Sequence, residues 1–351
     1  MNEHDLTETL QARVLEAIAL RRPLRILGSG SKDFYGRCTK GQALDIGDHS
    51  GVLTYEPSEL VITARAGTPL NQIETLLTQH GQMLPFEPPH FGPNATLGGC
   101  VATGLSGPRR PWAGAVRDAV LGVKLLNGKG EVLRFGGQVM KNVAGYDLSR
   151  LMAGSLGTLG ILLEISIKVL PRPAQEITLR QELDAETAQQ KLIAWSRLPL
   201  PISASLHHAG QLHVRLSGTI EGIQAACDQI GGDRLDGNGI WDDIREQRLD
   251  FFTDEPLWRL ALPATARIAL TGDCLSEWGG ALRWLHTGQP AAGIRAVAAT
   301  AGGHATLFRG HDGGGEVFQP LPPALLKLHQ RMKQALDPHG IFNPGRLYAT
   351  L

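Results

Sequence analysis

The sequence predicts an α+β fold with two lobes, and three observations lead to this expectation. At 351 residues the chain is long enough for two cores, and 42% of its residues are hydrophobic. A glycine-rich run, residues 88–171, separates short apolar segments whose turns need residues without side chains. Beyond Pro171 and Pro173 the texture changes to strands and helices of a second, smaller lobe.

Charge and cysteine usage exclude several classes of protein. The formal net charge is zero with a pI near 7.2, so the sequence gives no support for a nucleic-acid partner or an anionic membrane surface. The four widely spaced cysteines argue against a disulfide framework, a zinc ribbon or an iron–sulfur cluster in this chain. Because the N-terminus lacks an apolar leader and no long apolar run occurs, we expect a cytoplasmic protein with no membrane span.

The first phosphate-type loop follows a helix and a strand. Apolar residues every four positions predict a helix over 6–18, and Leu24–Leu27 predicts a strand that leads directly into the loop Gly28, Ser29, Gly30, Ser31, Lys32. A Rossmann loop would need a third glycine where Asp33 stands, and the next residues are not helical in pattern. Two interpretations remain open, namely a nest of amide groups for pyrophosphate and an ordinary Gly-Ser turn.

The rest of the first lobe alternates strands with short helices. We expect Thr68 to cap a helix that has Pro69 at its first position, and Asn127-Gly128 to join two strands in a hairpin. Asp147 to Leu151 predicts a short helix. Strands are expected at 43–46, 52–55, 60–66, 119–126, 131–134 and 161–170.

The second lobe has the order β-α-β-β-α-β, which is typical of a ferredoxin-like cap. Residues 258–262 are expected to form its last strand, and the tracts 231–239 and 310–315 are expected to be surface loops. A final helix presents an apolar stripe of Leu325, Leu328, Met332 and Leu336 and ends at Asp337-Pro338. The expected domains are therefore 1–171, 172–310 and a C-terminal segment, 311–351, that returns to the first domain.

Six motifs occur in order along nearly the whole chain. They are Gly-Ser-Gly-Ser at 28–31, Ala-Thr-Leu-Gly-Gly at 95–99, Arg-Asp-Ala-Val at 117–120, Gly-Tyr-Asp-Leu at 145–148, Gly-Ser-Leu-Gly-Thr-Leu-Gly at 154–160, and Leu-Asp-Pro with Asn-Pro-Gly at 336–345. With them the chain resembles the FAD-binding flavoproteins of the vanillyl-alcohol oxidase type, which have a PCMH-type FAD domain. Within that family its short cap and motif wording are most similar to the E subunits of bacterial glycolate oxidases.

The resemblance implies an FAD site with two pyrophosphate loops. The first is the loop 28–32 named above, and other segments lie near the flavin, the ribityl chain or the adenosine. The residues it assigns beyond the first loop are Thr96, Gly98, Gly99, Thr103, Gly104, Trp112, Gly114, Arg117, Asp118, Gly157, Gly160 and Ile161. His304 and Tyr146 are the candidates for a catalytic role, which the sequence leaves unknown.

Departures from the family pattern bear on chemistry. Ser31-Lys32 stands where some relatives carry a histidine that binds FAD covalently, so non-covalent FAD is expected, although His90 offers another imidazole. The metal motif of hydroxy-acid dehydrogenases in this family is missing. His207, His208 and His213 flank one turn and could meet a metal ion, but without acidic partners we favour exposed strand histidines and expect no metal.

The resemblance implies an FAD-binding subunit of a glycolate (2-hydroxy-acid) oxidase or dehydrogenase complex. Its partners would be a sister flavoprotein subunit and an iron–sulfur subunit, which would place it in the cytoplasm or at the inner membrane through those partners. The alternatives are a stand-alone flavin-dependent oxidoreductase and a non-catalytic scaffold with the flavin fold. Whether this subunit's own flavin receives electrons from the substrate or relays them stays open.

Overall fold

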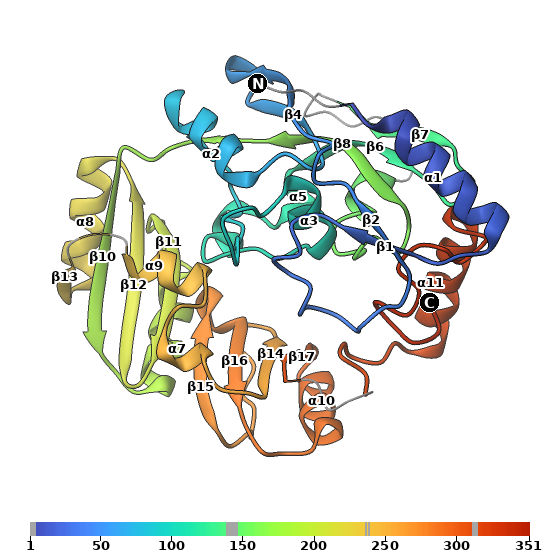
Figure 1. Ribbon diagram of the computed structural model, residues 1–351. Helices are drawn as coiled ribbons and strands as arrows, with labels where there is room; N and C mark the ends of the chain where they lie inside the picture. The colour runs from blue at the N-terminus through green and yellow to red at the C-terminus, as the bar shows by residue number, and fades with distance from the viewer. Residues whose placement is uncertain (1–4, 138–146, 236, 238, 311–314) are drawn as a thin grey trace. The chain divides into compact units, whose positions relative to one another are not determined.

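The computed structural model describes residues 5–137, 147–235, 237, 239–310 and 315–351 (Figure 1). The chain forms two compact units. The first comprises Met1–Ser106, Gly114–Pro171 and Pro320–Leu351, and the second comprises Gly107–Ala113 and Arg172–Gln319. A short piece of the glycine-rich run therefore belongs to the second unit.

An antiparallel five-stranded sheet forms the centre of the first unit, in the order β3-β4-β8-β6-β7. Its strands are β3 (Val52–Glu56), β4 (Val61–Arg65), β6 (Val120–Leu126), β7 (Val132–Gly136) and β8 (Ile161–Lys168). The expected Asn127-Gly128 hairpin is confirmed, because β6 and β7 pair in register with Lys124 opposite Arg134. Strand β8 is buried along nearly its whole length, which fits a central strand.

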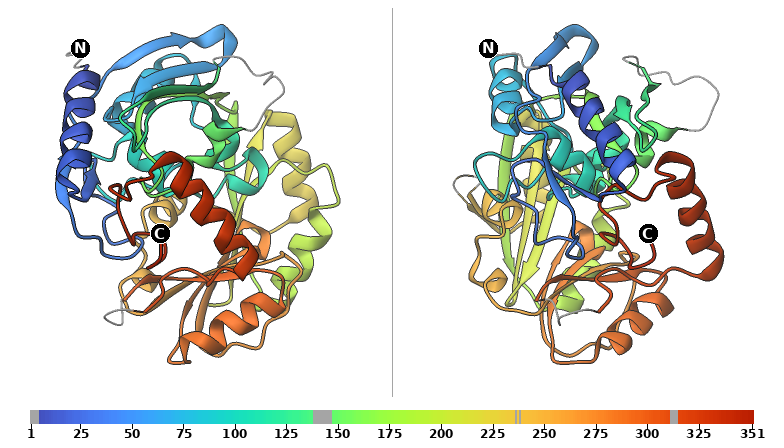
Figure 2. Two further views of the ribbon diagram at one scale, coloured as in Figure 1. Left: turned by 90° about the vertical axis from the view of Figure 1, so that its right-hand side faces the viewer. Right: turned by 45° about the vertical axis from the view of Figure 1, so that its right-hand side comes forward.

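Two small sheets complete the strands of this unit. Strands β1 (Leu24–Leu27) and β2 (Gln42–Asp45) pair in parallel, and β5 (Gln82–Met83) pairs antiparallel with β9 (Leu170–Pro171). Figure 2 shows the red C-terminal segment beside the blue strands of the N-terminal part, and a bridge joins Leu24 to Phe342. The C-terminal segment thus packs on the first loop's own strand.

Helices of the first unit cover this framework. They are α1 (Thr7–Leu20), α2 (Leu70–Gln79), α3 (Leu97–Thr103), α5 (Val116–Ala119), α6 (Leu148–Leu151) and α11 (Pro323–Leu336). The core joins Leu10 and Val14 of α1, Ile73 of α2 and Val101 of α3 to the inner faces of the strands. Each apolar side chain buried in this way contributes about 1.5–3 kcal/mol to folding.

The predicted cap of α2 is wrong. The N-cap residue is Pro69, and the hydroxyl of Thr68 does not cap the helix. Instead, Thr68 Oγ1 donates to the carbonyl oxygen of Arg65 over 2.7 Å and accepts the N–H of Gly51 over 2.9 Å. Thr68 is fully buried, and these bonds outcompete helix capping because they satisfy backbone groups of two other segments.

An eight-stranded sheet forms the second unit, in the order β13-β10-β12-β11-β15-β16-β14-β17. Its strands are β10 (Gln175–Glu182), β11 (Ile202–His208), β12 (Gln211–Gly218), β13 (Asp233–Leu235), β14 (Leu257–Ala261), β15 (Asp273–Glu277), β16 (Leu282–His286) and β17 (His304–Arg309). Its helices are α4 (Arg110–Ala113), α7 (Ala185–Trp195), α8 (Ile220–Ile230), α9 (Gly239–Arg245) and α10 (Ala291–Thr300). Helices α7 and α8 pack on one half of the sheet, and α10 packs on the other.

The sequence was misleading about the size of this lobe. The strand at 258–262 is not the last strand of a β-α-β-β-α-β unit, because β13 closes that run and β14 pairs with β16 and β17. The tract 231–239, expected as a surface loop, contains β13 and the start of α9. A three-residue edge strand between glycines gives too short an apolar pattern to be recognised. Residues 311–314 of the other tract lie outside the described residues.

The last helix differs from its predicted stripe. Leu325 and Leu328 are 40% and 51% exposed, whereas Lys333 and Leu336 are buried. The helix therefore turns a different face inward than its leucines suggested. Within the described ranges, no helix is long and apolar enough to cross a membrane.

Candidate functional site

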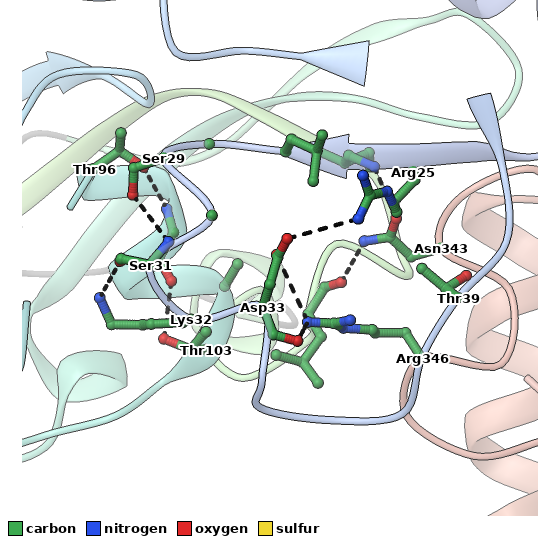
Figure 3. Close-up of a pocket in the computed structure, with 17 residues that line it drawn as sticks. Arg25, Ser29, Ser31, Lys32, Asp33, Thr39, Thr96, Thr103, Asn343 and Arg346 are labelled. Atoms are coloured by element: carbon green, nitrogen blue, oxygen red, sulfur yellow. Dashed lines mark hydrogen bonds and ion pairs between the residues drawn. The ribbon is translucent and has the colours of Figure 1, made fainter. Parts of the chain in front are cut away.

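The first loop is a compact turn at the carboxyl end of β1. The N–H of Asp33 donates to the carbonyl oxygen of Gly30 over 3.0 Å, and Gly30 has a φ of 74°, a left-handed value that suits glycine. Ser31 N–H donates to Ser29 Oγ at 3.4 Å, as Figure 3 shows. The strand therefore ends in a tight turn and not in a helix, in agreement with the failed Rossmann test.

Three amide groups of this loop are available to a ligand. In the part of the chain that the structure describes, the N–H groups of Gly28, Ser29 and Gly30 donate to no other residue. Consecutive amides in a turn of this kind make a concavity that binds anions. The nest interpretation is therefore favoured over the ordinary turn.

The second loop supports the first one. The N–H of Gly98 donates to Ala66 O over 2.7 Å, and that of Gly99 donates to Thr96 Oγ1 over 3.2 Å. These amides are already bonded within the protein and are not available in this structure to bind phosphate. A Cβ on Gly28 would lie 2.7 Å from Thr96 Oγ1, so the two loops approach closely only because residue 28 is glycine.

Three cations surround the first loop, and the sequence reasoning had identified only one of them. Arg25, Lys32 and Arg346 line one cavity together with a single carboxylate, Asp33. Lys32 is buried, and its Nζ donates to His90 O over 3.1 Å and to Ser31 Oγ over 3.5 Å, the second of which Figure 3 shows. Three positive groups against one negative group make this cavity electropositive although the whole chain is neutral.

Arg346 is held from several sides. Its Nη1 donates to Arg37 O at 3.1 Å and its Nη2 donates to Asp33 O at 3.0 Å, while Arg25 Nη1 lies 3.6 Å from Asp33 Oδ2. Burial lowers the pKa of Arg346, but a guanidinium remains charged near neutral pH. The cation is therefore fixed in position before any ligand binds.

Asn343 connects this cavity to the turn 154–160. Its Nδ2 donates to Leu156 O over 2.7 Å, and its Oδ1 accepts the N–H of Ile26 over 2.8 Å. A second cavity, lined by Gly157, Gly160 and others, shares Asn343 with the first. The two cavities enclose about 70 Å³ and 80 Å³, so each has room for one part of a dinucleotide and not for all of it.

A buried ion pair, Lys333 with Asp337, holds the turn that carries Asn343. Lys333 Nζ lies 2.7 Å from Asp337 Oδ2 and also donates to the carbonyl oxygens of Thr158 and Phe342. Asp337 accepts the N–H groups of Ile341 and Phe342. The C-terminal turn is thus anchored to the glycine-rich turn by a satisfied polar network.

Comparison with known proteins identifies the family. Residues 5–136 match the FAD binding domain family, and residues 316–347 match the C-terminal domain family of FAD linked oxidases. The chain is 51% identical over 353 aligned residues to glycolate oxidase subunit GlcE of Escherichia coli (strain K12), covering 100% of both chains. The chain belongs to the family of these glycolate oxidase subunits.

More distant relatives agree with this family. The GlcD subunit of Bacillus subtilis (strain 168) is 33% identical over 45% of this chain and 34% of its own length. A D-lactate dehydrogenase of Anaerostipes hadrus is 36% identical over 36% of this chain and 26% of its own. The structure of p-cresol methylhydroxylase with substrate bound shares the fold, with a TM-score of 0.70 at 14% identity over 98% of this chain and 88% of that one. The predicted α+β fold of the PCMH type is confirmed.

The residues present fit the FAD that this GlcE-type family binds. Three features suit a dianionic pyrophosphate. The first loop has unbonded amides, Gly28 leaves space that a Cβ would fill against Thr96, and three cations lie nearby. Of the residues assigned by resemblance, most lie together around the two cavities of the first unit. These are Gly28, Ser29, Gly30, Ser31, Lys32, Thr96, Gly98, Gly99, Thr103, Gly157 and Gly160.

Other assigned residues of the first unit line neither cavity. Asp118 accepts the N–H of Ala115 and so caps α5, and the Arg117 side chain is 67% exposed. Ile161 is fully buried in the core at the start of β8. Gly104, with a φ of 65°, ends α3, and Gly114, with a φ of 91°, precedes α5. The contacts of these residues in the structure are local ones, and their assignment to FAD stays a prediction.

The remaining candidates fall elsewhere. Trp112 lies in α4 of the second unit and is 41% exposed, and His304 begins β17 of the same unit with an exposed side chain. Tyr146 lies outside the described residues. Cys100 is buried, and burial raises the pKa of its thiol to about 12, so it stays protonated and unreactive.

The expectation that the three histidines of the β11–β12 turn are exposed is wrong, because His207 is buried and His208 and His213 are half-buried. His207 Nε2 contacts Leu183 O at 2.8 Å, whereas His208 Nε2 lies 3.3 Å from Asp273 Oδ1. Adjacent residues of a strand point to opposite faces, so these two rings cannot share an ion. Over the described ranges, no cluster of three or more His, Cys, Asp or Glu side chains could hold a metal.

Sequence reasoning missed several residues that line the cavity at the first loop, notably Arg25, Asp33, Thr39 and Arg346. Arg25 sits inside the strand that precedes the loop, where an alternating pattern suggests only packing. Arg346 directly follows the Asn-Pro-Gly turn, which was expected to return to the first domain. A charged residue at that position could have been recognised as a candidate for the ligand site.

Proposed function

We propose that this chain is the FAD-binding subunit of a glycolate oxidase or dehydrogenase complex, that it holds FAD non-covalently, and that it takes part in electron transfer from glycolate towards an iron–sulfur partner. The observation that carries the proposal is the first loop, whose free amides lie among Arg25, Lys32 and Arg346. The full-length likeness to a glycolate oxidase subunit supports the choice of substrate.

The energetics of this loop suit pyrophosphate. Each hydrogen bond to a charged group contributes about 1.5–3 kcal/mol, and the amides of Gly28, Ser29 and Gly30 supply three of them. Desolvation of a dianion costs several kcal/mol per charge, so amides alone are marginal. Arg25, Lys32 and Arg346 add electrostatic attraction for the pyrophosphate, which the chain's net charge of zero cannot provide.

The protein offers no evident covalent attachment point in the first loop, where Ser31 and Lys32 stand. The imidazole of His90 is engaged, because its Nε2 lies 3.2 Å from a carboxylate oxygen of Glu74. Bound FAD would supply the redox chemistry, accepting two electrons and passing them on singly. The chain's own residues would hold the dinucleotide and exclude water from its phosphates.

An electron acceptor is needed beyond this chain. Cys38, Cys100, Cys227 and Cys274 are the only cysteines, and their spacing fits no iron–sulfur motif. The proposal therefore includes an iron–sulfur subunit as well as a sister flavoprotein subunit, and a cytoplasmic location or one at the inner membrane through those partners. Oxidation of glycolate to glyoxylate releases two electrons, which this arrangement passes to the cluster.

The test compares the assembled complex with and without flavin in this subunit. The double variant Lys32→Gln, Arg346→Gln removes two charges from the cavity, and Arg13→Gln, at an exposed side chain of α1, is its control. The proposal expects that the double variant still co-purifies with its partners, lacks the flavin of this subunit and has lost glycolate-dependent reduction of the cluster. Full activity of a complex whose subunit is proven free of flavin would identify a scaffold.

A second measurement locates the substrate. The isolated chain with FAD is mixed with glycolate in the absence of oxygen, and the flavin absorbance is followed. Bleaching by glycolate alone would indicate a self-sufficient oxidoreductase and overturn the proposed dependence on partners. Flavin that stays oxidised until the partner subunits are added supports the relay.

A further inference from the structure

A separate cavity lies within the second unit, and none of the residues assigned to FAD lines it. It encloses about 340 Å³ between α7, strands β11, β15 and β16 and the loop 262–272. This volume is at the lower end of the range for small-molecule sites, and it is several times that of the first-unit cavities. None of the motifs found in the sequence accounts for it.

Polar residues of three strands form one row across the floor of this cavity. His207 of β11 is directly opposite Ser276 of β15, and Ser276 is directly opposite Arg283 of β16. Residues directly opposite one another in an antiparallel sheet point to the same face. Cys274, two positions before Ser276, shares that face, and all four line the cavity.

Arg283 is the positive group of the row. Its Nε donates to Gly280 O at 3.3 Å, and its Nη2 donates to Ala266 O. None of the described carboxylates pairs with it, and Glu186 at the rim pairs instead with the exposed Arg267 at 3.3 Å. Burying a cation without a counter-ion is costly, so a half-buried guanidinium bonded only to carbonyl oxygens favours an anion beside it.

The opposite wall is apolar. Ala188 and Leu192 of α7 and Ile268 of the loop line it. The loop is fastened by Gln189, whose Nε2 donates to Ala264 O over 2.6 Å. The polar floor carries a cation and a hydroxyl group, and the side opposite it is apolar. Such a cavity matches a molecule with a negatively charged end and a short carbon chain.

We propose that this cavity binds a small organic acid, with its carboxylate against Arg283 and Ser276 and its carbon chain against Leu192 and Ile268. The proposal goes beyond the FAD site and does not depend on it. The planar guanidinium of an arginine can donate two parallel hydrogen bonds to one carboxylate. This property explains why an arginine stands at position 283.

Cys274 gives a local reporter for the test. Cys274 is an exposed residue that lines the cavity, and Cys38 is the other exposed residue among the described cysteines, whereas Cys100 and Cys227 are buried. In the full-length protein carrying Cys38→Ser, the rate at which the neutral reagent iodoacetamide labels Cys274 is measured. The probes are hexanoate, hexan-1-ol as its neutral counterpart, and inorganic phosphate.

Hexanoate is expected to slow the labelling in a saturable manner, and hexan-1-ol and phosphate are expected to leave it unchanged. Arg283→Gln should weaken the apparent affinity for hexanoate by about tenfold or more, because a charged hydrogen-bond donor is lost. The matched control, Arg180→Gln at an exposed side chain of β10, should bind as the parent does. Protection by hexan-1-ol would reduce the cavity to an apolar pocket, protection by phosphate alone would replace the organic acid by an inorganic ion, and no protection would exclude the site.

A second variant covers the case in which Arg283→Gln does not fold. Ser276→Asp places a carboxylate opposite Arg283 and supplies the counter-ion from the protein itself. We expect this variant to fold with an unchanged circular dichroism spectrum and to lose protection by hexanoate. A folded Ser276→Asp protein that hexanoate still protects would contradict the proposal.

Discussion

The side-chain amide of Asn343 donates to the carbonyl oxygen of Leu156 over 2.7 Å, although 187 positions separate the two residues. Leu156 has a φ of 51°, a value that residues other than glycine rarely adopt, and Gly157 follows with a φ of 69°. A Cβ on Gly157 would lie 2.8 Å from Asn343 Nδ2. The C-terminal turn therefore holds the glycine-rich turn in a conformation that it would not adopt unaided.

This relationship predicts the effect of Asn343→Ala. The change leaves the buried Leu156 O and the half-buried Ile26 N–H without these partners, and each buried unsatisfied group costs about 1–3 kcal/mol. We expect a lower Tm and loss of FAD, measured by calorimetry and by flavin absorbance after gel filtration. The control is Asn71→Ala, which removes only an exposed 3.4 Å bond to Pro93 O. Equal behaviour of the two variants would refute the anchoring role.

Arg346→Gln tests the contribution of charge. The variant keeps hydrogen-bonding groups near Asp33 O and Arg37 O but removes a cation from the cavity. We expect FAD to bind about tenfold or more weakly, in line with the value of a charged hydrogen bond, and the salt dependence of binding to fall. Titration of the flavin-free protein with FAD at two salt concentrations measures both. Arg13→Gln, which changes an exposed side chain lining neither cavity, should bind as the parent does.

Gly99→Asp tests the position of the second loop. Gly99 lines both first-unit cavities, and a Cβ there would meet Thr96 Oγ1 at 3.1 Å. A carboxylate at this place would face the proposed pyrophosphate and repel it, so the purified variant should be colourless. Gly288→Asp, at an exposed glycine of the second unit with open space around it, should remain yellow. Full flavin content in Gly99→Asp would contradict the placement of the dinucleotide.

His49 should make the protein less stable in acid. It is fully buried, its Nδ1 accepts the N–H of Leu6, and burial lowers its pKa despite the nearby carboxylate of Asp5, with Arg65 and Lys124 acting in the same direction as burial. A histidine whose pKa is lower in the folded state than in the unfolded state binds its proton first in the unfolded state. Stability is therefore lost as the pH falls below the ordinary histidine pKa of about 6.5, by up to about 1.4 kcal/mol per pH unit until the folded pKa is reached.

The measurement for His49 is chemical denaturation at a series of pH values. His49→Gln should be less stable than the parent near neutral pH, and the difference should shrink as the pH falls below about 6.5. His80→Gln, at an exposed histidine that contacts only the carbonyl oxygen of Leu76 and the ring of Tyr55, provides the comparison. A parallel pH dependence in the parent and His49→Gln would show that this residue does not titrate as described.

Much of the first lobe could be predicted because its signals are local. The strand before the first loop, the Asn127-Gly128 hairpin and the short helix expected at 147–151 each depend on a few adjacent residues. Thr68 was misassigned because its hydroxyl satisfies distant backbone groups, which no local pattern reveals. The sequence predicted only half of the strands of the eight-stranded sheet, because strand order depends on long-range pairing.

The site was partly predictable for a similar reason. Glycines and hydroxyls in two loops were found from the sequence, and the structure places most of them around shared cavities. Whether an amide is free cannot be read from a sequence, since Gly98 and Gly99 turned out to donate within the protein. Arg25 and Arg346 are brought together across 321 positions by the return of the C-terminal segment, so their joint charge appears only after folding.

The central claim is that this chain by itself holds FAD without a covalent bond. The most direct measurement is the flavin absorbance of the purified chain, followed by acid precipitation and a search for FAD in the supernatant. The account predicts a yellow protein, or a colourless one that becomes yellow with added FAD, and complete release of the flavin into the supernatant. A chain that takes up no FAD, or whose flavin remains in the precipitate, would contradict it.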